Sequence, residues 1–219
     1  MLCLFDIDGT LVDTGGAGLR ALEETTRHVF GADGPPLDLA GSTDLGIVYG
    51  LLAHFGEPAT EERIAGYFDH YHIRLKWNLA NGGFPGRALA GAEALLDALA
   101  NRANVAIGLL TGNTRHGAET KTIHFGFGGR FHFGAYGCDH HERNLLGPIA
   151  LTRARQHHRR AFHPEETWII GDTPKDIACA RALGARCLAV ATGRFSMAEL
   201  SAYGADVVVA TLEDAADLL

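Results

Sequence analysis

Two aspartates directly after an apolar segment offer the first chemistry in this chain. Residues 2–5 form a short apolar run typical of a buried strand, and Asp6 and Asp8 follow it. Two carboxylates a few ångströms apart repel each other by roughly 4 kcal/mol at an effective dielectric near 20. Such a pair persists where a cation lies between them or one carboxyl stays protonated, which suits a magnesium-assisted nucleophile and acid–base pair. The alternative is a polar strand exit that only caps a loop.

A second pair of aspartates follows another apolar run. Asp172 comes after residues 168–170, and Asp176 lies one helical turn further on. In an open α/β sheet the ligand crevice lies beyond the carboxyl ends of the strands, so both carboxylates can face it. Oxygen ligands of this kind select a hard ion such as Mg²⁺. The alternative is a helix N-cap followed by a surface aspartate.

A third polar group consists of Thr111, Gly112 and Asn113, which follow an apolar run of their own. A hydroxyl, a backbone N–H and an amide at a helix N-terminus together predict a phosphate cradle. Gly112 and Gly117 have the spacing of a nucleotide-binding P-loop, but Ala118 stands where such a loop requires lysine. A nucleotide P-loop is therefore excluded.

The elements that must position these residues alternate along the chain. The expected strands are 2–5, 105–110, 168–170, 187–190 and 207–209, with 134–137 as a further candidate. The expected helices between them are 88–101, 114–124, 145–160, 174–183 and 197–203. Continuous apolar strands separated by helices predict an α/β fold with a parallel sheet covered on both faces.

Residues 15–83 break this alternation. They contain three helical patterns and no convincing strand over about 70 residues, far more than a βαβ crossover needs. The excess must form its own helical unit, inserted after the first strand. The expected domains are therefore 1–14 together with 84–219 as the α/β core, and 15–83 as a helical insert.

Composition limits the classes of function. The 219 residues are 47% hydrophobic and 21% charged, which suits a globular chain rather than a membrane bundle. The formal net charge of −7 argues against non-specific binding to nucleic acid or anionic lipid, since both require a basic face. The four cysteines lack CxxC spacing, and three of them lie in apolar or alanine-rich surroundings, which favours small buried apolar residues over a metal or redox site. We expect a reducing, cytoplasmic location. A monomer or homodimer is expected.

Three segments resemble, in this order, motifs of a known superfamily. Residues 6–11 (Asp-Ile-Asp-Gly-Thr-Leu), 110–113 (Leu-Thr-Gly-Asn) and 171–176 (Gly-Asp-Thr-Pro-Lys-Asp) are similar to motifs one, two and four of the haloacid dehalogenase-like (HAD) hydrolases. The phosphoglycolate phosphatase-like branch is the most similar. The resemblance extends over essentially the whole chain. It implies a doubly wound, mainly parallel, Rossmann-like sheet with a small α-helical cap at 15–83.

The resemblance also implies a Mg²⁺-dependent phosphatase acting on a small phosphorylated metabolite, with phosphoglycolate as the substrate that the branch suggests. Asp6 would attack phosphorus to form an aspartyl-phosphate. Asp8 would protonate the leaving oxygen and then activate the water that hydrolyses the intermediate. Mg²⁺ would be held by Asp6, the Asp8 backbone carbonyl and Asp172, with Asp176 as a further or indirect partner. Dehalogenases of the superfamily lack the second aspartate, so dehalogenation is not expected.

The third motif of the family is where this chain departs from the resemblance. That motif usually supplies a lysine, but no lysine occurs between Lys121 and Lys175. Arg143 is the predicted substitute, because a guanidinium stays charged and can bind phosphate with two nitrogens. Together with Thr111 and Gly112 it would hold the transferring phosphoryl oxygens. A solvated arginine at the start of a helix is the alternative.

The cap would choose the leaving group of the substrate. Arg20, Ser42, Thr43 and Asp44 are candidates because they stand at predicted helix starts or near the hinge, although helix capping explains Ser42 and Thr43 equally well. Two other functions stay open. One is a sugar phosphomutase of the same superfamily, and the other is a phospho-accepting or ligand-binding relative without turnover. None of the twelve histidines has spacing that demands zinc.

Overall fold

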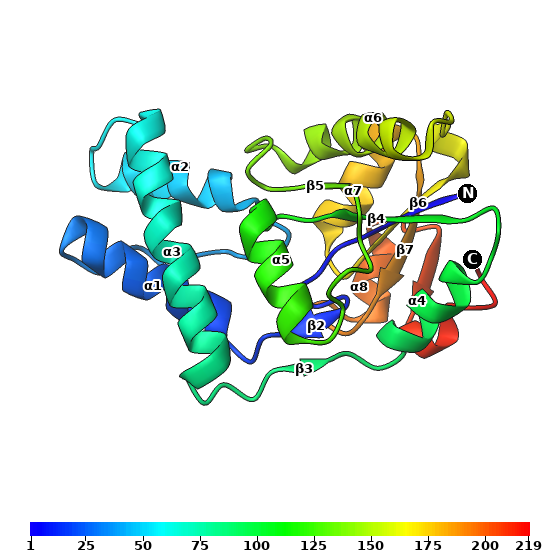
Figure 1. The fold of residues 1–219 in the computed structure, drawn as a ribbon, viewed down its shortest axis with the longest axis horizontal. Helices are drawn as coiled ribbons and strands as arrows, with labels where there is room; N and C mark the ends of the chain where they lie inside the picture. The colour runs from blue at the N-terminus through cyan, green and yellow to red at the C-terminus, as the bar shows by residue number, and fades with distance from the viewer.

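A six-stranded parallel sheet forms the centre of the molecule (Figure 1). The computed structural model describes residues 1–219. In spatial order the strands are β5 (Gly134–Ala135), β4 (Ala106–Leu110), β1 (Leu2–Phe5), β6 (Thr167–Gly171), β7 (Arg186–Val190) and β8 (Val207–Val209). Because β1 lies between β4 and β6, the segments that follow these three strands emerge side by side. The predicted α/β fold class, with a mainly parallel sheet, is confirmed.

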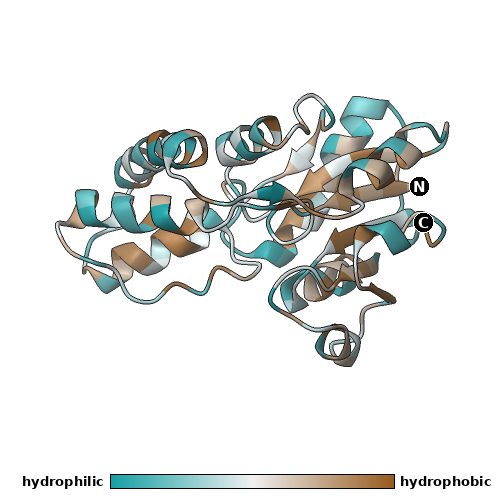
Figure 2. Cartoon of the chain, turned by 90° about the horizontal axis from the view of Figure 1, so that it is seen from below, coloured by the Kyte–Doolittle hydropathy of each residue, from teal (hydrophilic) through white to brown (hydrophobic).

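Both faces of the sheet are covered, because the strands are apolar on both sides. Cys3 and Phe5 pack in one buried cluster with the leucines of α4 (Ala92–Ala100). Leu2 and Leu4 point the other way and pack in a second cluster with α6 (Leu146–His158) and α7 (Pro174–Leu183). Figure 2 shows the central strands in the brown of apolar residues and the helices around them in mixed colours. Burial on both faces is the reason that these strands appear in the sequence as continuous apolar runs.

Three helices lie together at the end of the molecule away from both termini (Figure 1). They are α1 (Ala17–Phe30), α2 (Asp44–His54) and α3 (Glu61–Asn81). Their apolar faces form a third cluster, separate from the two clusters of the sheet, which includes Leu22, Leu51 and Tyr71. The boundaries of a core and a cap domain stay a prediction.

A two-stranded antiparallel ribbon joins the chain before and after these helices. β2 (Val12–Asp13) pairs with β3 (Arg87–Ala88), so the two connections to the helical segment run next to each other. Gly15 has a positive φ of 63°, and a Cβ there would lie 2.9 Å from the backbone of Pro85 and Gly86. Only glycine allows the two connections to approach this closely.

The remaining elements complete the layers around the sheet. They are α5 (Arg115–His124), α8 (Met197–Ala202) and three short 3-10 helices, η1 (Arg143–Leu145), η2 (Pro164–Glu166) and η3 (Leu212–Asp214). None of the helices combines the length and the apolar character that crossing a membrane requires.

Candidate active site

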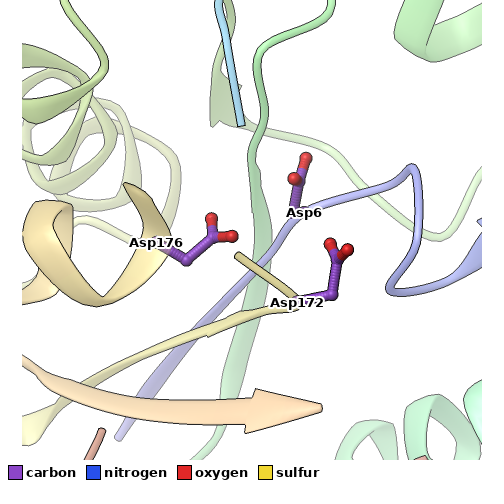
Figure 3. Close-up of side chains that lie close together, drawn as sticks. All are labelled: Asp6, Asp172 and Asp176. Carbon is purple, nitrogen blue, oxygen red and sulfur yellow. The ribbon is translucent and has the colours of Figure 1, made fainter. Parts of the chain in front are cut away.

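Three carboxylates converge at the carboxyl end of the sheet (Figure 3). Asp6 directly follows β1 and Asp172 directly follows β6. The parallel pairing of Phe5 with Ile170 places Asp6 beside Gly171, only one residue before Asp172. One oxygen each from Asp6, Asp172 and Asp176 lies within 4.8 Å of the others. Segments about 165 residues apart in the sequence thus meet at one point, as the strand positions predicted.

Asp176 is held in place by the start of α7. Thr173 is the N-cap, Pro174 occupies the first turn, and Asp176 completes a capping box by accepting hydrogen bonds from the Thr173 N–H (3.0 Å) and hydroxyl (2.6 Å). The other carboxylate oxygen of Asp176 accepts a hydrogen bond of 2.5 Å from Nη2 of Arg143. Asp176 is fully buried, so both the helix cap and the arginine limit its orientation.

Arg143 places a cation against the predicted nucleophile. It lies in η1 and is buried, and its Nη2 is 3.0 Å from Oδ2 of Asp6 as well as bonded to Asp176. Burial by itself would lower the pKa of the guanidinium, but Asp176 and Asp6 more than offset this and raise the pKa above its ordinary value. Its Nε has no hydrogen-bond partner. The alternative of a solvated arginine is therefore wrong.

Burial makes the ionised state of this cluster costly. The pKa of Asp6 is raised to about 6. Burial is the main cause, the charge of Arg143 opposes it, and the charge of Asp176 adds to it. Burial, followed by the charges of Asp176 and Asp6, also raises the pKa of Asp172 well above its ordinary value. One guanidinium cannot balance three carboxylates. A divalent cation with a preference for oxygen ligands would do so, and the donor set therefore fits Mg²⁺.

Asp8 lies beside the cluster and has different partners. Its side chain is 42% exposed, and both of its oxygens accept hydrogen bonds from Nζ of Lys121, at 2.7 and 2.6 Å. Asn113 donates to Asp8 at 2.8 Å and accepts from Lys121 at 2.7 Å. These three side chains form a closed polar triangle at the mouth of the site.

Lys121 is not among the residues predicted from the sequence. Its side chain is only 4% exposed, although it is charged. In α5 the buried positions are Gly117, Ala118, Lys121 and Thr122, which form one helical stripe. A lysine on an otherwise small, buried stripe is the signal that could have identified it, because a buried ammonium requires a partner.

The loop after β4 is built from its own side chains. Thr111 is fully buried, and its hydroxyl accepts hydrogen bonds from the backbone N–H of Asn113 (3.3 Å) and from its amide (2.8 Å). A Cβ at Gly112 would lie 1.9 Å from the carbonyl oxygen of Ser42, so glycine is required here by close packing against the segment before α2. Gly112 and Asn113 line the cavity and Thr111 does not. Phosphate binding by this loop stays a prediction.

The candidate specificity residues of the helical segment do not all lie at the cavity. Arg20 does not reach the cavity: its side chain is 45% exposed and pairs with Glu24 at 3.0 Å and Glu23 at 3.8 Å. Its expected role is therefore not supported, because the inner face of α1 carries Leu19 and Leu22 instead.

The residues at the start of α2 serve mainly to attach that helix. Thr43 is its N-cap, accepting from the N–H of Gly46 and donating to the carbonyl of His141 at 2.6 Å. Asp44 is buried, lines the cavity, and accepts a hydrogen bond of 2.7 Å from the N–H of Thr114. Burial raises the pKa of Asp44 to about 6. Ser42 also lines the cavity, and its hydroxyl accepts from Lys175 at 2.7 Å.

A cavity of about 440 Å³ opens over the carboxylates. Its floor comes from the strand ends and includes Asp6, Asp8 and Asp172, and its other side comes from the helical segment, including Leu19 and Ile47. The arrangement combines a buried carboxylate beside a guanidinium, oxygen ligands for a cation, and a polar triangle at one edge. These are the parts required for phosphoryl transfer to a carboxylate.

Known proteins resemble the chain both in sequence and in fold. Residues 146–215 match a family model described as "HAD-hyrolase-like". None of the curated proteins matches the sequence. A hydrolase from Pseudomonas syringae is 20% identical with a TM-score of 0.72, covering 100% of this chain and 97% of that one.

Two further solved structures have the same fold. CbbY from Rhodobacter sphaeroides in complex with phosphate is 19% identical with a TM-score of 0.72, covering 98% of this chain and 95% of that one. A predicted phosphoglycolate phosphatase from Haemophilus somnus is 17% identical with a TM-score of 0.69, covering 99% and 96%. The chain thus resembles the HAD-like hydrolases in the sequence of its C-terminal third and in the fold of its whole length, as its motifs predicted.

Proposed function

We propose that this protein is a Mg²⁺-dependent phosphatase that hydrolyses small phosphomonoesters through an aspartyl-phosphate at Asp6. The observation that carries the proposal is the convergence of Asp6, Asp172 and Asp176 within 4.8 Å, with Arg143 3.0 Å from Asp6. The phosphate bound to the structurally similar CbbY is consistent with it.

Asp6 and Asp172, with the backbone carbonyl of Asp8, would hold the metal ion. When bound, Mg²⁺ supplies positive charge that screens the repulsion between the anionic nucleophile and the anionic substrate. Asp176 would act mainly through Arg143, because its two oxygens are engaged by Thr173 and by the guanidinium.

Side chains of this protein have distinct roles in the two chemical steps. An Asp6 oxygen forms a bond to phosphorus as the bond to the leaving oxygen breaks, and Arg143 stabilises the negative charge on the phosphoryl oxygens. Asp8 gives its proton to the leaving oxygen. It then takes a proton from the water that attacks the aspartyl-phosphate, which releases phosphate and restores Asp6. Lys121 and Asn113 fix the orientation of Asp8 for both transfers.

The metal can be tested directly by phosphate release from p-nitrophenyl phosphate. We expect EDTA to abolish release and added Mg²⁺ to restore it, because three buried carboxylates with one guanidinium leave the site uncompensated without a divalent cation. Hydrolysis that is insensitive to EDTA would contradict the metal site. No release from a panel of phosphorylated metabolites with Mg²⁺ would overturn the proposed function, and isomerisation of a hexose 1-phosphate without release would favour a phosphomutase.

The role of Asp8 predicts a dependence on the leaving group. In Asp8→Asn, kcat/KM for an alkyl phosphate should fall by about 10²-fold or more, because an alkoxide must be protonated as it leaves. The same variant should lose much less kcat/KM for p-nitrophenyl phosphate, whose leaving group is stable as an anion. Asp13→Asn, in the β2 ribbon, is the control and should change neither value. Equal losses for both esters would contradict general acid catalysis by Asp8.

A further inference from the structure

The cavity above the carboxylates has an apolar side that the proposed chemistry does not use. Leu19 and Leu22 of α1 and Ile47 of α2 line it, with Leu37, Leu39 and Tyr71 beside them. The reacting phosphoryl group must lie against Asp6, on the floor. The apolar residues therefore face the position of the leaving alcohol.

The positive charges of the cavity are already paired. Arg143 contacts Asp6 and Asp176, and Lys121 is bonded to both oxygens of Asp8. Arg194 lies at the rim with a side chain that is 74% exposed, 3.4 Å from Asp38. The lining residues contributed by positions 14–71 include no lysine, arginine or histidine.

Apart from Arg194, which pairs with Asp38 at the exposed rim, the ionisable groups on the leaving-group side are acidic. Asp44 and Asp38 both line the cavity. Burial already raises the pKa of Asp44 to about 6, so this region disfavours negative charge. If the substrate carried a carboxylate in addition to its phosphate, that carboxylate would lose its hydration here without an unpaired cation to bind it. An uncharged alkyl or aryl group would instead gain from contact with the leucines.

We propose that the site selects phosphomonoesters of uncharged alcohols with an apolar part, and rejects phosphomonoesters that carry a carboxylate, phosphoglycolate included. This inference rests on the proposed phosphatase function. It runs against the substrate suggested by the branch resemblance. The physical basis is the pairing of an apolar wall with acidic residues and the absence of a free cation on that wall.

Two aryl esters of nearly the same shape test the inference. In 4-carbamoylphenyl phosphate the para group is neutral, whereas in 4-carboxyphenyl phosphate it is an anion at pH 7. We expect kcat/KM for the carbamoyl ester to be at least about tenfold higher. Phosphoglycolate and its neutral amide should show the same order.

A substitution on the wall should change this preference. Leu19 is suitable because it lines the cavity and is 40% exposed, so a longer side chain can be accommodated there. Leu19→Arg should reduce the ratio between the two aryl esters by about tenfold, since it supplies the missing cation. Leu19→Gln, which adds polarity without charge, should leave the ratio within about twofold of the original.

The possible results separate the inference from the proposed function. Hydrolysis of the carboxylated ester at a rate equal to or above that of its neutral partner would overturn the inference and leave the phosphatase in place. An unchanged ratio in Leu19→Arg would also overturn it. Release of phosphate from none of the four esters by the Mg²⁺-loaded protein would overturn the proposed function, and the inference with it.

Discussion

Replacing Asp6 with asparagine should lower kcat/KM for any phosphomonoester by at least about four orders of magnitude. The amide of asparagine cannot form the bond to phosphorus, and no other carboxylate of the cluster is free to take over. Asp176 is engaged by Thr173 and Arg143. Phosphate release under saturating Mg²⁺ measures the effect, and acid-quenched protein should contain no aspartyl-phosphate.

The fold of this variant should be intact. Burial above all raises the pKa of Asp6 to about 6, so this carboxyl is ionised at pH 7 at a greater cost in the folded protein than in the unfolded one. A neutral amide removes that cost. We therefore expect the thermal midpoint of Asp6→Asn to equal or exceed that of the unmodified protein. A large drop in the thermal midpoint would mean that the variant loses activity because it unfolds.

Asp172→Asn is the matched control, because it removes a carboxylate of the same buried cluster. Its activity should fall and should partly recover at higher Mg²⁺ concentrations, whereas Asp6→Asn should not recover at all. Residual turnover of Asp6→Asn within about tenfold of the original rate would remove Asp6 from the role of nucleophile.

The positions of Asp6 and Asp172 could be predicted from sequence because they depend on local pattern alone. Each follows a continuous apolar strand, and parallel strands end at the same edge of a sheet. The capping box of Thr173 and Asp176 is also a local pattern. The contact of Asp176 with Arg143, 33 residues earlier, depends on the packing of η1 against α7 and has no local signal.

The helical segment shows where sequence reasoning failed. Arg20 is a candidate from its position near a predicted helix start and the hinge, but which face of α1 turns to the cavity depends on how the three helices pack on one another. The residues that do line it, Leu19 and Leu22, look like ordinary core positions in the sequence. For Lys121 the sequence predicts the helix, 114–124, but not the role of the side chain. Its ammonium contacts Asp8, which lies 113 residues away in the chain.

Replacing Arg143 with methionine should lower the free energy of unfolding by about 3–5 kcal/mol at pH 7, besides abolishing activity. Methionine keeps much of the volume of the side chain but leaves Asp6 and Asp176 buried without a cation. Urea unfolding measures the loss. Arg130→Met is the control, because Arg130 pairs with the half-exposed Asp97, and such surface pairs contribute about 1 kcal/mol or less.

The loss of unfolding free energy in Arg143→Met should also depend on pH, and the titration of Asp6 determines the direction. Asp6 has a pKa of about 6 in the folded protein, above the ordinary 3.8, so the folded state binds the proton more tightly and its stability falls as pH rises between these values. Without Arg143, which lowers that pKa, the fall should continue to higher pH. The difference between the two proteins should therefore widen from pH 5 to pH 8 and narrow when Mg²⁺ is added. A difference that is independent of both pH and Mg²⁺ would mean that Arg143 stabilises the fold by packing rather than by its charge.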